Sequence, residues 1–136
     1  MSTERATEAT RQALKALRQG LLQLHKMLLE QERRDFERAR GPISNSYEFL
    51  QLVLKDPWFD WLHRLSELIV QIDETLDTHA ETPATEADAN ALIERAKNLL
   101  TPAETGSEFQ KNYFLALQQS PDVVLLHSEL MKVLGR

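Results

Sequence analysis

The 136-residue sequence predicts an all-α fold, an antiparallel helical bundle of four principal helices with one or two short extra helices. Only four glycines and five prolines interrupt the chain, which favours long helices over strands and turns. Apolar residues recur at spacings of three and four along most of its length, the period of a helix with one buried face. The polar connections are short, which is typical of antiparallel neighbours in a single domain.

The amino-acid composition argues against several classes of function. There is no cysteine, which excludes disulfides and thiolate chemistry. The first residues lack an apolar signal segment and no long apolar run follows, so we expect a cytoplasmic protein with no membrane contact. Nine Lys/Arg against six Asp/Glu give residues 1–40 a charge of +3, and seven against fifteen give the rest −8. The acidic total of −5 argues against nucleic-acid binding.

The first helix is predicted from Thr7 to Ala39, before Gly41-Pro42, with residues 1–10 frayed. At 1.5 Å per residue it would be on the order of 50 Å long, so we expect part of it to overhang or to pack on another chain. Its apolar positions form a heptad seam, which predicts a homodimer. The seam comprises Leu14, Leu17, Leu21, Leu24 and Leu28.

Capping residues and prolines divide the remaining chain. Ser44 or Asn45 can cap a short helix through Leu54, with Tyr47, Leu50, Val53 and Leu54 as its apolar positions. Asp56-Pro57 predicts the start of a third helix through Asp77, followed by a polar linker at 78–86. Further starts are predicted from Thr85 with Asp88, from Ser107, and from Ser120-Pro121, the last helix reaching Leu134.

Six of the nine aromatic residues lie between Phe36 and Trp61. They can form part of the hydrophobic core at the end of the bundle where the chain turns between helices. They can also line an apolar ligand pocket or a partner groove, with Tyr47, Phe49, Trp58 and Trp61 as the candidate residues.

Asp60, His63 and Glu67 lie on one helical face and are the candidate metal ligands, with His25 or His127 as a donor from a second helix. The alternative is an ordinary exposed face, because Asp60 suits the first turn of a helix and His63 with Glu67 is a common surface pair. No catalytic residue and no cofactor are predicted. The glycines are isolated and form no phosphate loop.

Two parts of the sequence resemble a family of small bacterial helical proteins of unassigned function. The first is Asp56-Pro57-Trp58-Phe59-x-Trp61-Leu62 with Ser66-Glu67-Leu68-Ile69. The second is Ser120-Pro121-Asp122-Val123-Val124-Leu125. This resemblance implies a bacterial cytoplasmic protein and brings no catalytic residues. The expected architecture is also loosely similar to haemerythrin-like and DinB-like bundles, whose histidine-rich metal motifs do not occur in this sequence.

The sequence therefore predicts a non-enzymatic helical interaction or regulatory module that self-associates and binds an unknown protein partner. The alternatives are a bundle that binds a small apolar ligand at its aromatic end and a metal-binding bundle.

Overall fold

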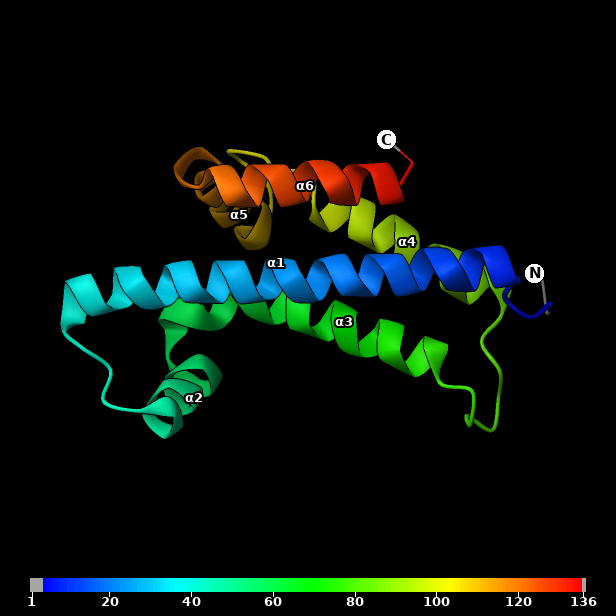
Figure 1. The fold of residues 1–136 in the computed structure, drawn as a ribbon, viewed down its shortest axis with the longest axis horizontal. Coiled ribbons are helices and arrows are strands. Elements are labelled where there is room, and N and C mark those ends of the chain that lie inside the picture. The colour runs from blue at the N-terminus through cyan, green and yellow to red at the C-terminus, as the bar shows by residue number, and fades with distance from the viewer. Residues whose placement is uncertain (1–3, 136) are drawn as a thin grey trace.

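The structure, a computed structural model, describes residues 4–135 and is helical, as the sequence predicts (Figure 1). Within this range it contains six α-helices and one 3₁₀-helix, and one isolated antiparallel bridge joins Arg5 to Thr85. No helix in the described part of the chain is long and apolar enough to cross a membrane. The elements are α1 Glu8–Arg40, α2 Ser46–Lys55, η1 Pro57–Leu62, α3 His63–Leu76, α4 Glu86–Leu99, α5 Glu108–Gln119 and α6 Pro121–Val133.

The long helix α1 is the centre of the fold. In Figure 1, α3 runs along one side of α1 and α6 along the other, both in the opposite direction to α1. Helix α4 packs against both α3 and α1, and α5 packs against α6 and η1. Only α1, with 33 residues, is long, and the other α-helices have 10 to 14 residues, so length does not separate four principal helices from the rest.

The heptad seam of α1 forms the centre of this core. Its five leucines are 0–1% exposed within a single chain, because α3, α4 and α6 cover them. A homodimer that keeps this core intact therefore has to use other side chains. The C-terminal part of α1 is also covered by the same chain, since Phe36 is 7% exposed and packs against Trp58 and Phe59.

The helix starts follow the predicted caps. The side chains of Thr7, Asn45, Thr85, Ser107 and Ser120 each accept a hydrogen bond from a backbone N–H in the first turn of the next helix. Thr85 and Asp88 form a reciprocal capping box. These local hydrogen bonds satisfy N–H groups that have no partner inside the helix, which explains why the starts can be read from the sequence.

The predicted third helix is divided in two. Residues 57–62 form the 3₁₀-helix η1, and the α-helix begins only at His63. Pro57 has no N–H, the Asp56 carboxylate accepts from Trp58 N, and Phe59 N donates to Asp56 O, which gives a tight turn. The 3₁₀ geometry, with three residues per turn, lets Phe59, Trp61 and Leu62 all reach the core.

The start of the described chain is held by the segment before α4. Ala6 N donates to Ala84 O at 3.2 Å, and Glu86 N donates to Glu4 O at 2.8 Å. Of the residues expected to fray, 4–10 thus include two backbone hydrogen bonds to the chain around α4 and the first residues of α1, and 1–3 lie outside the described residues. The polar connection itself spans residues 77–85.

Candidate functional site

Helix α2 lies outside the main body of the bundle, below α1 in Figure 1, and packs on η1. None of its residues is buried, although six of the ten are apolar in its sequence, Ser-Tyr-Glu-Phe-Leu-Gln-Leu-Val-Leu-Lys. Its apolar side chains lie on two faces. Because only one face meets the protein, the other is left in contact with solvent.

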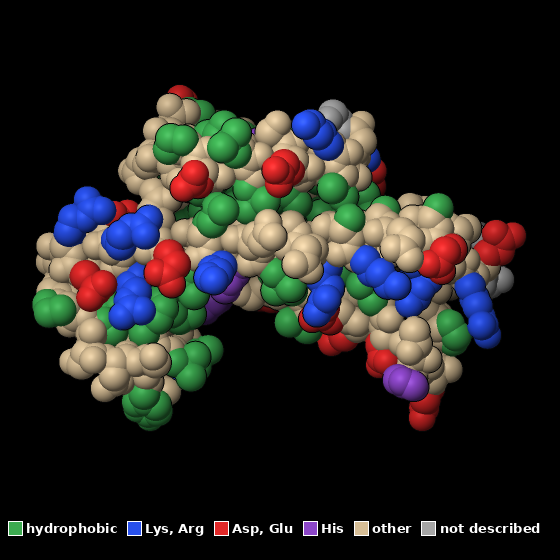
Figure 2. All heavy atoms as spheres, in the orientation of Figure 1, with side chains coloured by type: hydrophobic (Ala, Val, Ile, Leu, Met, Phe, Trp, Pro, Cys, Tyr) green, Lys and Arg blue, Asp and Glu red, His purple; other side chains and the backbone are tan. Residues whose placement is uncertain are grey.

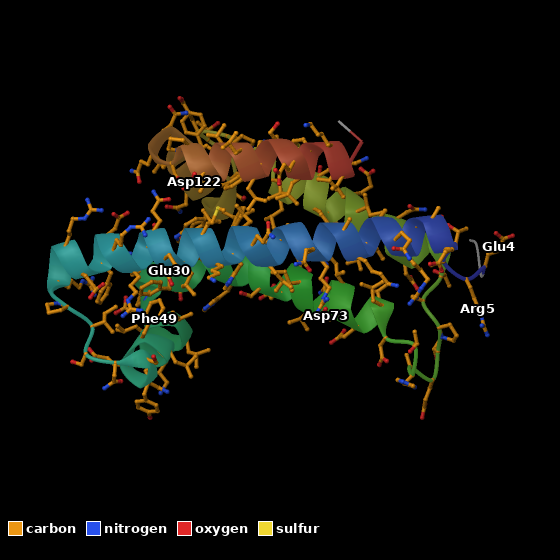
Figure 3. All side chains as sticks on the ribbon, viewed as in Figure 1. Glu4, Arg5, Glu30, Phe49, Asp73 and Asp122 are labelled. Carbon is orange, nitrogen blue, oxygen red and sulfur yellow. The ribbon has the colours of Figure 1, made fainter. Side chains whose placement is uncertain are left out.

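The inner face of α2 is formed by Phe49, Leu52 and Val53, which pack against the core. In Figure 3, Phe49 lies on the side of α2 that faces α1. Its ring is 5.9 Å from that of Phe59, and the Arg33 guanidinium lies 4.7 Å from its centroid. The carbonyl of Val53 accepts a hydrogen bond from His63 Nε2 at 3.0 Å. These contacts fix the orientation of α2 on the bundle.

Three large apolar residues form what we call the α2 outer face: Tyr47, Leu50 and Leu54, which are 73%, 52% and 57% exposed. Their spacing of three and four places them along one side of the helix. Hydrophobic side chains gather over α2 at the lower left of Figure 2. The four predicted apolar positions of this helix therefore divide between two faces: Val53 packs against the core, whereas Tyr47, Leu50 and Leu54 face solvent.

The four predicted pocket residues do not form one aromatic cluster. Phe49 and Trp58 belong to a group with Phe36 and Phe59, in which Trp58 meets Phe36 edge to face at 5.5 Å. Trp61 belongs to a second group with Phe109, Tyr113 and His127. Tyr47 takes part in neither group. Trp61 is buried, Phe49 and Trp58 pack against the core, and Tyr47 is 73% exposed.

Glu32 on α1 lies beside both tryptophans. Burial raises the pKa of the Glu32 carboxyl, and this effect is partly offset by the indole N–H groups of Trp61 and Trp58. Both indole nitrogens are buried and make no hydrogen bond within the described residues. The Glu32 carboxyl is the nearby acceptor whose pKa these indole groups lower.

The metal hypothesis receives no support from the geometry. Within residues 4–135, no group of three or more His, Asp or Glu side chains is placed to hold a metal ion. Asp60 and Glu67 are exposed, and His63 Nε2 is engaged by the Val53 carbonyl. Burial lowers the pKa of His25 and the nearby His63 lowers it further, but within the described residues no third metal-ligating side chain joins this pair.

The other two predicted donors have partners of their own. His25 Nε2 is 2.9 Å from Ser66 Oγ, which links α1 to α3. His127 Nδ1 is 2.7 Å from the Tyr113 hydroxyl, which links α6 to α5. A serine hydrogen-bonded to a histidine can begin a nucleophilic site, but catalysis also needs a group that orients the histidine and donors for an oxyanion. Among the described residues, no carboxylate is hydrogen-bonded to His25.

Comparison of the chain with protein-family models, curated proteins and solved structures gives no match.

Proposed function

We propose that this protein is a non-enzymatic helical interaction module that associates through the α2 outer face. In this proposal α1, α3, α4 and α6 form the antiparallel bundle that presents α2. The observation that carries the proposal is the exposure of Tyr47, Leu50 and Leu54, between 52% and 73%, on a helix with no buried residue. Contiguous exposed apolar side chains of this size commonly mark protein-interaction surfaces.

A second copy of the chain is the proposed occupant. The α2 outer face carries no formal charge, so two copies can meet across a two-fold axis without like-charge repulsion. Rows of apolar side chains at helical spacing are also the usual anchors in helix-to-helix recognition. Three side chains present roughly a few hundred Å², below the roughly 800 Å² per partner of a standard interface, so we expect a weak dimer.

The test is the molar mass of the full chain by sedimentation equilibrium, from about 10 μM to about 500 μM, because mass action reveals weak dimers only at high concentration. We expect the mass to rise toward that of a dimer. The double variant Leu50→Glu/Leu54→Glu should stay monomeric over the same range. Its fold should be retained, because both side chains already contact water.

The matched control is Val70→Glu on α3, which changes an apolar side chain of similar exposure, 52%, outside α2. It should dimerise like the unaltered chain. A monomeric mass at all concentrations, or equal dimerisation by the double variant, would contradict the proposal.

A further inference from the structure

A cleft of about 250 Å³ lies between α3, α4 and the start of α5. Arg64 and Arg95 line it together with polar and apolar side chains, and no Asp or Glu lines it. Four other clefts on the described surface each have at least one Asp or Glu among their lining residues. This cleft therefore differs from its neighbours in carrying positive charge alone.

The two arginines are unusual in their sequence context. Residues 41–135 contain fifteen Asp and Glu but only two arginines, Arg64 and Arg95. One comes from α3 and the other from α4, and the packing of these two helices brings both to the same cleft. In a segment of strongly negative net charge, the convergence of both arginines concentrates positive potential at one concave site.

Neither guanidinium forms an ion pair with a carboxylate of residues 4–135. Among the described residues, the ion pairs within 4.0 Å include neither Arg64 nor Arg95. Arg95 donates to the neutral amide oxygen of Gln71, which leaves its charge uncompensated. A planar guanidinium without a carboxylate partner is well suited to bind a phosphate or carboxylate group through paired charge-assisted hydrogen bonds.

Hydrogen-bonded polar groups also line the cleft. Gln110 Nε2 donates to the Asn98 carbonyl at 2.9 Å, and Gln110 Oε1 accepts from Ser107 N at 3.0 Å. This arrangement ties the start of α5 to the end of α4. The capping box engages the amides of Ser107 and Gln110, and the two arginines supply the formal positive charge of the site. The buried Leu68 adds an apolar contact.

We propose that this cleft binds a small phosphate-bearing molecule, whose phosphate is held by Arg64 and Arg95. The volume is below the roughly 300–1,000 Å³ of sites for drug-sized ligands, so it suits a phosphate group with few additional atoms. The site uses residues of α3, α4 and α5 and does not depend on association through α2. The Leu50→Glu/Leu54→Glu variant should therefore bind phosphate as the unaltered chain does.

The test is a titration of the full ¹⁵N-labelled chain with inorganic phosphate, followed by amide chemical shifts at constant pH and ionic strength, with sodium chloride as the reference salt. We expect phosphate-specific shifts at residues lining the cleft. Arg64→Gln and Arg95→Gln should each weaken binding at least about tenfold, because each removes a charge-assisted contact. Arg64→Lys keeps the charge but not the planar guanidinium, so its affinity for phosphate should lie between those of the unaltered chain and Arg64→Gln.

Arg34→Gln is the matched control, because Arg34 is an exposed arginine of α1 that makes no ion pair within the described residues. It should leave the shifts unchanged. The proposal is overturned if chloride produces the same shifts, or if Arg34→Gln reduces them as much as the cleft variants do. It is also overturned if Arg64→Gln and Arg95→Gln both bind like the unaltered chain while remaining folded in their ¹⁵N spectra.

Discussion

Gly20 of α1 lies directly against Leu130 of α6, so closely that a Cβ atom at position 20 would overlap the Leu130 side chain. Leu130 is 1% exposed and has little room to move. The close approach of α1 and α6 thus depends on the missing side chain, which also explains a glycine in the middle of a 33-residue helix.

Gly20→Ala should lower the free energy of unfolding by about 1 kcal/mol, because overpacking costs about 1–3 kcal/mol and the gain in helix propensity returns about 1 kcal/mol. Urea unfolding measures the change. In the Leu130→Ala background the same substitution should no longer destabilise, because the overlapping atoms are gone. Equal effects of Gly20→Ala in both backgrounds would show that Leu130 is not the reason for the glycine.

Tyr113→Phe should lower the free energy of unfolding by about 1 kcal/mol, because it removes the hydrogen bond to His127 while keeping the ring. Tyr113 is fully buried, and burial raises the pKa of its hydroxyl. The hydroxyl therefore stays protonated near neutral pH, and the tautomer of His127 sets which partner donates. In a His127→Phe background, which removes the hydrogen-bond partner, Tyr113→Phe should have a clearly different effect on urea unfolding. Additive effects would argue against the hydrogen bond.

Two histidines should make stability depend on pH. Burial lowers the pKa of His25 and of His127 from 6.5, and for His25 the proximity of His63 lowers it further. The unfolded chain therefore binds protons at these sites before the folded chain does. The free energy of unfolding should be highest above pH 6.5 and should fall as the pH drops from 6.5 toward the folded pKa values.

Urea unfolding at several pH values between about 7.5 and 5.5 measures this effect, in a range above the titration of ordinary carboxyls. The variant His25→Asn/His127→Asn should show a flatter dependence in this range. An unchanged slope in the double variant would assign the pH dependence to other groups.

Two substitutions of Glu32 should change the free energy of unfolding in opposite directions. Because burial raises its pKa, the ionised form is disfavoured in the folded state at pH 7, so Glu32→Gln should slightly increase the free energy of unfolding. Glu32→Ala should lower it by about 1–3 kcal/mol, because it removes the carboxyl that interacts with both buried indole N–H groups. Tryptophan fluorescence during urea unfolding reports both changes. Equal destabilisation by the two variants would contradict the acceptor role of the carboxylate.

Some features follow from short stretches of sequence. The start of α1 after Thr7 and the capping box of Thr85 with Asp88 are set by hydrogen bonds within four residues, so they could be predicted. The leucine seam from Leu14 to Leu28 also predicts a buried stripe correctly. The seam does not reveal whether the helices that cover it belong to the same chain. Helices of another chain would bury these leucines as well as α3, α4 and α6 do.

Other features depend on contacts between distant segments. Helix α2 is apolar on two faces, and its packing on η1, α1 and the start of α3 decides that Phe49 turns inward while Tyr47 remains 73% exposed. The division at His63 arises because three large side chains after Pro57 must reach the core together. Likewise, Arg64 and Arg95 are 31 positions apart, and no local pattern relates them.

Local sequence thus decides that this protein is helical, where most of its helices begin and which stripe of α1 is buried, because propensity, capping and periodicity act over a few residues. The tertiary structure decides which apolar face stays in water and which charges share a cleft. Those outcomes depend on which helices become neighbours, and that choice is made by the packing of the whole core around α1.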